Sequence, residues 1–132
     1  MKVKTLILIM AILCLLWGVG FILFPAPFWA LYGLTLDEGG IYMARQLGVV
    51  FGMLGLVLWL VRNDVAGRAL RGITLGLCIG NALGLVVALY GQLTADISAL
   101  GWVGVVTYLL LTLGFGYCLL KPTDTALRVG RA

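Results

Sequence analysis

The stretch "IYMARQLGVVFGMLGLVLWLV", residues 41–61, decides the fold, because it is long and apolar enough to cross a lipid bilayer. A membrane-spanning helix needs about 20 mostly apolar residues. Arg45 is the one charged residue in this stretch, and Gln46 follows it directly. Two questions arise from it: how many such segments the chain has, and why one of them holds a guanidinium group.

Three further segments have the same apolar character, at about residues 5–24, 72–92 and 101–120. Of the 132 residues, 63% are hydrophobic and 11% are charged, whereas soluble domains are about half apolar and about a quarter charged. We therefore predict an all-α polytopic membrane protein, a four-transmembrane-helix antiparallel bundle in a single domain over residues 1–132. The first segment is longer than a signal peptide core and lacks an A-x-A site, so we expect it to be retained.

Charge orients the bundle, because every basic residue except Arg45 falls on one side of a four-pass chain. These residues are Lys2, Lys4, Arg62, Arg68, Arg71, Lys121, Arg128 and Arg131. The positive-inside rule then places both termini in the cytoplasm. The net charge of +4 is explained by this grouping and does not point to a nucleic-acid partner, because the charges do not share one exposed face.

Small residues form a stripe on each of the two middle segments. Gly72, Gly76, Gly80 and Gly84 recur every four residues in the third segment, and residues 44, 48 and 52 do the same in the second. Such spacing permits close approach of helix backbones in membranes. We expect the two stripes to pack against each other within the chain, since a short polar loop joins these helices; the alternative is an oligomer interface.

The first outer connection, "FPAPFWALYGLTLDEGG", carries two local patterns. Its aromatic residues have helical spacing after two prolines, which predicts a short turn in the membrane interface. Its "TLDE" matches a capping box, in which Thr35 caps the second spanning helix and Glu38 reaches back to Thr35. We therefore expect that helix to begin near Leu36.

Arg45 has two interpretations. A charge at the bilayer centre costs roughly 2.5–3.5 kcal/mol, and less toward the edge, so Arg45 near the outer end can extend to the headgroups. Alternatively, its helical phase, close to Gly48 and Gly52, turns it into the protein, where a guanidinium needs a counter-ion or a bound guest. The second interpretation predicts an outward-facing ligand-binding pocket. Its residues would be Arg45, Gln46, Glu38, Asp37, Asp96 and Gln92.

Other polar and reactive residues indicate packing more than chemistry. Asn81 lies mid-span beside the glycine stripe, and we expect an interhelical hydrogen bond to Thr107, Tyr108 or Thr112. The chain has no histidine, and its three cysteines are far apart in apolar runs, where they usually act as small apolar residues. We predict no catalytic residue, no metal site and no cofactor.

The chain resembles the DoxX-like superfamily of small four-helix bacterial membrane proteins. The resemblance rests on "FPAPFWALYGL", on "DEGGIYMARQLG" with its R-x-x-G pair Arg45 and Gly48, and on the two glycine-rich helices that follow. It implies a location in the bacterial inner membrane and makes Arg45 the first residue to test. Some members are subunits of quinone-linked oxidoreductases, and others are assembly factors.

These observations favour a non-enzymatic accessory, assembly or lipid-interacting component of the membrane. The alternative is an enzyme or binder that acts on an amphipathic ligand, such as a quinone or lipid, through Arg45 and nearby carboxylates. A small exporter is disfavoured, because the first segment lacks the embedded carboxylate that proton coupling requires. The expected partners are membrane lipids, an amphipathic ligand, and a membrane protein or a second copy of the chain.

Overall fold

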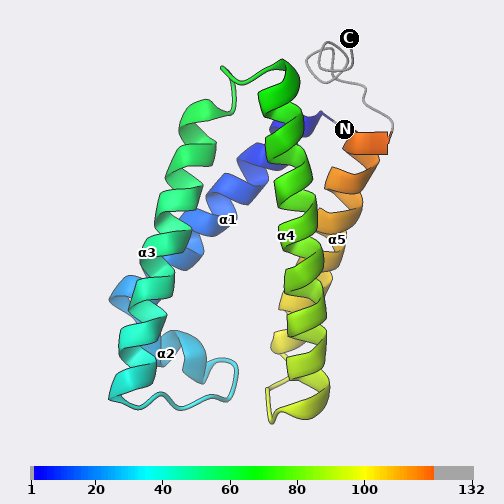
Figure 1. Cartoon of the computed structure of the whole chain (residues 1–132). Coiled ribbons are helices and arrows are strands. Elements are labelled where there is room, and N and C mark those ends of the chain that lie inside the picture. The colour runs from blue at the N-terminus through cyan, green and yellow to red at the C-terminus, as the bar shows by residue number, and fades with distance from the viewer. Residues whose placement is uncertain (1, 121–132) are drawn as a thin grey trace.

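A computed structural model describes residues 2–120, which form five helices and no strands (Figure 1). They are α1 (Val3–Leu23), α2 (Pro25–Ala30), α3 (Glu38–Val61), α4 (Gly67–Thr94) and α5 (Gly101–Leu120). Four of them, all except α2, are long and apolar enough to cross a membrane. The predicted all-helical architecture with four long apolar segments is confirmed, and the predicted short turn corresponds to α2, which begins at Pro25 and includes both prolines. The basic residues Lys121, Arg128 and Arg131 lie outside the described residues.

The start of α3 differs from the predicted capping box. The helix begins at Glu38, and the carboxylate of Asp37 accepts a hydrogen bond from the backbone N–H of Gly40 at 2.7 Å. Asp37 therefore caps the helix, and the prediction that Thr35 caps a helix beginning near Leu36 is wrong. The physical reason is position, because an N-cap side chain reaches the second or third helical N–H, and Asp37 is the residue placed to do so.

The two ends of the molecule are held by contacts between distant segments. At one end Nζ of Lys4 donates to the carbonyl oxygen of Asn63 at 3.2 Å, which ties the start of α1 to the α3–α4 loop. At the other end the backbone N–H and Oγ of Ser98 donate to the carbonyl oxygens of Tyr32 (2.8 Å) and Leu31 (2.9 Å). The first end carries the basic residues of the described chain except Arg45, and the second carries Asp37, Glu38 and Asp96.

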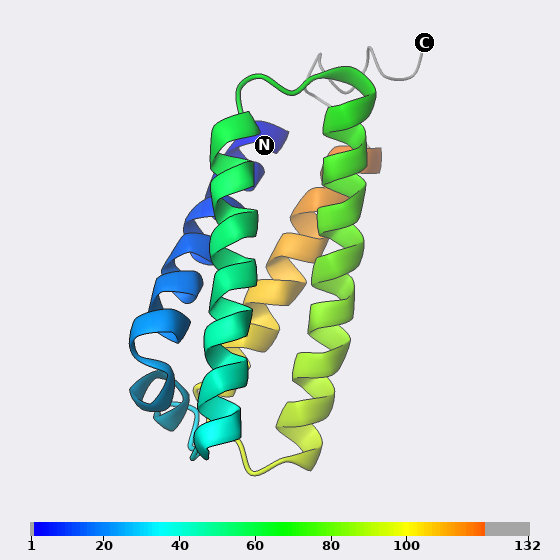
Figure 2. The same cartoon turned by 60° about the vertical axis from the view of Figure 1, so that its left-hand side comes forward.

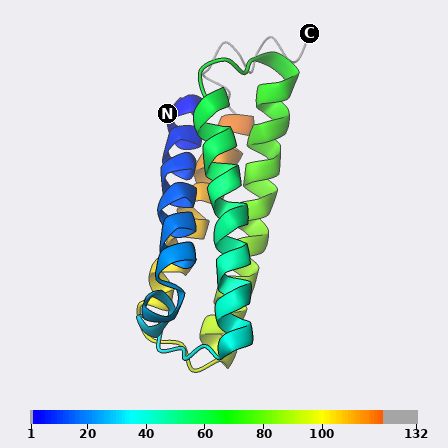
Figure 3. The same ribbon diagram turned by 90° about the vertical axis from the view of Figure 1, so that its left-hand side faces the viewer.

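Helices α1 and α3 pack closely together, and they lie side by side in Figure 3. A Cβ atom added to Gly18 of α1 would lie 2.8 Å from the backbone nitrogen of Gly52 and 3.0 Å from the carbonyl oxygen of Gly48. One added to Gly55 would lie 2.9 Å from the nitrogen of Leu15. The small face of α3 is therefore committed to α1. The prediction that it packs against the glycine stripe of α4 is wrong.

Helix α4 packs instead against α5, so the molecule consists of two helix pairs (Figures 1 and 2). The ring of Tyr108 covers Gly84, whereas Cβ atoms added to Gly72, Gly76 or Gly80 would meet nothing within 4 Å. A buried apolar cluster joins the pairs, drawn mainly from the half of the molecule that holds the α3–α4 loop. Its members are Val3, Leu6, Ile7, Ala11, Leu58, Leu70, Leu77, Leu111, Phe115 and Cys118.

The glycine contact between α1 and α3 predicts different outcomes for two alanine substitutions. Gly18→Ala should lower the free energy of unfolding by about 1–3 kcal/mol, the usual cost of overpacking, because the new methyl group meets backbone atoms. Gly52→Ala should change it by much less, since its Cβ enters open space. Denaturation of the purified protein in mixed micelles, followed by circular dichroism, measures both. Equal losses for the two variants would contradict this packing.

Candidate functional site

The structure places Arg45 on the surface of α3. Its side chain is exposed, and no ion pair joins it to a carboxylate within residues 2–120. Gly48, three residues further along α3, already faces Phe21 and Ile22 of α1, and α1 ends at Leu23. No spanning helix therefore continues beside α3 at the level of Arg45. The expectation that its guanidinium is turned into the protein and neutralised there by an acid of the chain is wrong.

The other predicted pocket residues lie at the same end of the molecule as Arg45, near the α4–α5 connection. Asp37 caps α3, and Glu38 and Asp96 are exposed. Nε2 of Gln46 donates to the hydroxyl of Tyr42 at 2.8 Å. Nε2 of Gln92 donates to the carbonyl oxygen of Ser98 at 3.2 Å and so holds the α4–α5 connection. Ligand binding by these residues stays a prediction.

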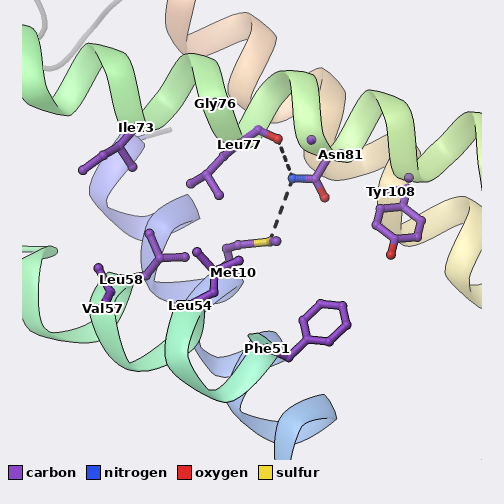
Figure 4. A pocket seen from close by; sticks show the side chains of 12 residues that line it. Met10, Phe51, Leu54, Val57, Leu58, Ile73, Gly76, Leu77, Asn81 and Tyr108 are labelled. Carbon is purple, nitrogen blue, oxygen red and sulfur yellow. Dashed lines mark hydrogen bonds between the residues drawn. The ribbon is translucent and has the colours of Figure 1, made fainter. Parts of the chain in front are cut away.

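A crevice of about 500 Å³ lies between the two helix pairs (Figure 4). Helices α3 and α4 supply most of its wall, and α1 and α5 contribute one residue each. The lining residues are Met10, Phe51, Leu54, Val57, Leu58, Ile73, Gly76, Leu77, Gly80, Asn81, Gly84 and Tyr108. The crevice exists because the unpartnered glycines of α4 bring no side chains into the space, and because α3 packs against α1 instead of against α4.

Asn81 is the buried polar residue of this crevice, with 2% of its surface exposed. Its Nδ2 donates to the carbonyl oxygen of Leu77 at 2.7 Å and to Sδ of Met10 at 3.9 Å. The Leu77 carbonyl can only accept, which fixes the amide orientation and leaves Oδ1 directed away from it. Oδ1 is buried and has no hydrogen-bond partner within residues 2–120, and Figure 4 shows it on the side of Tyr108.

The predicted partners of Asn81 do not bind it. The hydroxyls of Thr107 and Thr112 donate to carbonyl oxygens one turn back on their own helix, those of Val103 and Tyr108. The hydroxyl of Tyr108 forms no hydrogen bond with the described part of the chain, although Tyr108 lines the same crevice as Asn81. The interhelical contact of Asn81 is made with Met10 of α1.

Aromatic rings of α1, α2 and α3 pack together beside the crevice, and Phe51 belongs to both. Phe51 lines the crevice and packs edge-on against Phe21 with ring centroids 6.0 Å apart. Phe21 in turn stacks on Trp29 at 5.2 Å, and the indole Nε1 of Trp29 is buried without a partner among the described residues. Burial, and secondarily the nearby Tyr108 hydroxyl, raises the pKa of Tyr32. Phe28, Trp29 and Tyr32 therefore pack against the aromatic residues Trp17 and Phe21 of α1.

Sequence reasoning did not select the crevice as the site. It identified the glycine stripe of α4 but assigned it to helix packing, and it assigned Asn81 to an interhelical hydrogen bond. The two features together could have indicated the crevice. An amide in the middle of a helix, beside a glycine stripe that no other helix covers, faces the space that the glycines leave open. Nothing in the sequence distinguished Tyr108 from the other aromatic residues.

Comparison with models of protein families, with curated proteins and with solved structures finds no match to this chain. The chemistry of the crevice therefore follows from the residues that line it. None of the lining residues carries a charge, and their polar groups are an amide and a phenol. Such a set can hold an apolar molecule and hydrogen-bond an uncharged polar group. Within residues 2–120 no group of His, Cys, Asp or Glu side chains is placed to hold a metal ion.

Proposed function

We propose that this chain is a non-enzymatic lipid-binding protein of the bacterial inner membrane that holds the apolar chain of a lipid in the crevice between α3 and α4. The observation that carries the proposal is the crevice itself. Its volume of about 500 Å³ falls within the range of about 300–1,000 Å³ that is usual for small-molecule sites. Its lining is almost wholly apolar, and it lies between helices that are long enough to cross the bilayer.

The position of the crevice supports a lipid as the occupant. Gly76 and Gly80 are exposed, and a Cβ atom on either would meet open space, so the wall of α4 is accessible along this face. In a bilayer this face adjoins lipid chains. The apolar side chains that line an empty space lack dispersion contacts on that side, and an inserted lipid chain would restore them. An assembly role would use the same face, with a helix of another protein in place of the lipid chain.

Charge distribution supports an orientation with both termini in the cytoplasm. The start of α1 and the α3–α4 loop share one end and carry lysine and arginine, whereas the opposite end carries acidic residues. Alkaline phosphatase fused after Asp96 should therefore be active in the periplasm, and the same fusion after Asp64 should be inactive. If only the Asp64 fusion were active, the proposed orientation would be wrong and both termini would lie in the periplasm.

Filling the crevice should prevent lipid binding without disturbing the fold. In Gly80→Leu the new side chain enters the crevice, because a Cβ at Gly80 meets nothing within 4 Å. We expect this variant to retain its helical content and melting temperature in detergent. We expect it to lose at least about tenfold of the lipid that co-purifies with the wild type, as quantified by native mass spectrometry.

The matched control is Gly72→Leu. Gly72 lies on the same stripe and also faces open space, but it does not line the crevice. It should bind lipid as the wild type does, since the two variants share their composition and their cost in helix propensity. Equal lipid retention by Gly80→Leu and the wild type would rule out the crevice as the binding site.

Arg45 supports a second candidate function, which is binding of an anionic headgroup in the outer leaflet. Its guanidinium is exposed near the outer end of α3 and has no carboxylate partner within residues 2–120. A guanidinium presents paired donors that match a phosphate group. The resemblance to the DoxX-like superfamily supports the same residue, and the contact between Gly48 and Gly18 gives a physical reason for the glycine of its R-x-x-G pair.

Substitution of Arg45 tests this candidate. Arg45→Gln should abolish a preference for phosphatidylglycerol over phosphatidylcholine, measured by native mass spectrometry of protein released from mixed nanodiscs. Arg45→Lys should retain part of the preference, because lysine keeps the charge but loses the paired geometry. An unchanged lipid preference in Arg45→Gln would show that the residue only extends to the interface.

A further inference from the structure

We propose that Asn81 and Tyr108 form a hydrogen-bonding site in the middle of the bilayer for the hydroxyl group of an uncharged long-chain lipid alcohol. The inference rests on the proposed function, because it assumes that a lipid enters the crevice, and it adds which lipid. It combines four observations. They are an unpaired buried acceptor, an unpaired phenol, the absence of charge from the lining residues, and the depth of the site in the membrane.

Depth excludes the common phospholipid headgroups from the site. Asn81 lies at the middle of α4, which runs from Gly67 to Thr94, so it is about 20 Å from either end at 1.5 Å per residue. The hydrocarbon core of a bilayer is about 30 Å thick. A phosphate group would have to leave the interface to reach Asn81. Burial of such a charge is costly without a compensating ion pair, and no lining residue offers one.

The unpaired atom of Asn81 selects a donor. Its Nδ2 is already used by the carbonyl oxygen of Leu77 and by Sδ of Met10, and its Oδ1 is buried with no partner in residues 2–120. A buried acceptor without a donor is expensive to maintain, and a ligand that supplies the donor removes that cost. A hydroxyl group supplies one. An ester, an ether or an alkane does not.

Tyr108 provides the complementary group. Its ring lies directly against Gly84, because a Cβ atom added to Gly84 would lie 2.5 Å from Cε1 of the ring. Its hydroxyl has no hydrogen bond within the described residues and lines the same crevice as Asn81 (Figure 4). An alcohol can donate to Oδ1 of Asn81 and accept from the Tyr108 hydroxyl at the same time, because a hydroxyl group is both donor and acceptor.

Access to Oδ1 requires a side chain to move, since the atom is fully buried. Met10 contacts the amide at Nδ2, with its Sδ 3.9 Å away, and lines the crevice beside it. Methionine is unbranched and flexible, and it readily fills or vacates irregular spaces. The apolar chain of the alcohol then lies along Phe51, Leu54 and the glycines of α4, which line the remainder of the crevice.

A competition experiment with three probes of equal chain length tests the inference. Purified full-length protein in detergent is incubated with equal amounts of 1-hexadecanol, hexadecyl methyl ether and hexadecyl acetate, and bound species are counted by native mass spectrometry. The wild type should retain the alcohol in about three- to tenfold excess over either competitor, the ratio that one neutral hydrogen bond supports. Tyr108→Phe, which keeps the ring against Gly84, should reduce this excess, and Asn81→Leu should remove it while all three probes still bind.

The controls separate this inference from the proposed function. Equal retention of the three probes by the wild type overturns the hydroxyl site and leaves the lipid-binding crevice intact. Absence of all three probes from the wild type, or their full retention by Gly80→Leu, overturns both. If Asn81→Leu fails to fold, the wild-type ratio and Tyr108→Phe still decide, because neither depends on that variant. An alcohol excess that persists unchanged in both variants also overturns the site.

Discussion

The backbone contact between Gly18 of α1 and Gly48 and Gly52 of α3 is the constraint on which the rest of the structure depends. It uses the small face of α3 and leaves the glycine stripe of α4 without a helix to pack against. Tyr108 of α5 covers Gly84 at one end of that stripe, while Gly76 and Gly80 stay open. The crevice is thus a consequence of how the helices pair, because a glycine face with no partner leaves space in a membrane bundle.

The sequence was sufficient for the spans and the ends but not for the pairing of helices. Hydropathy is summed over about 20 residues, so the four spans are well determined even where their boundaries shift by several residues. Pairing depends on single atoms. Lipid chains are as apolar as leucine, and small faces therefore associate only where backbones fit closely. Gly18 follows the small residues Ala11 and Cys14 at helical spacing, but this pattern is less regular than the glycine stripes of α3 and α4, and α1 was therefore not predicted as the partner of α3.

The predicted inward orientation of Arg45 was wrong for a related reason. Its helical phase was read correctly relative to Gly48, but the depth at which α1 ends is a property of the folded pair and is not visible in α3 alone. The same holds for the helix cap, where Asp37 and Thr35 are both suitable residue types and only the path of the chain decides between them. Asn81 was expected to be buried and is, yet its partner Met10 comes from a helix about 70 positions away.

The two helix pairs are tied at both ends, and the contact of Met10 with Asn81 joins them between the ends. Lys4 and the apolar cluster hold one end, and Ser98 holds the other through Leu31 and Tyr32. Oδ1 of Asn81, which has no hydrogen-bond partner within residues 2–120, lies between these two ends. An apolar residue there would avoid the desolvation cost of the amide, whereas the hydroxyl group of the proposed occupant would supply the donor that Oδ1 lacks.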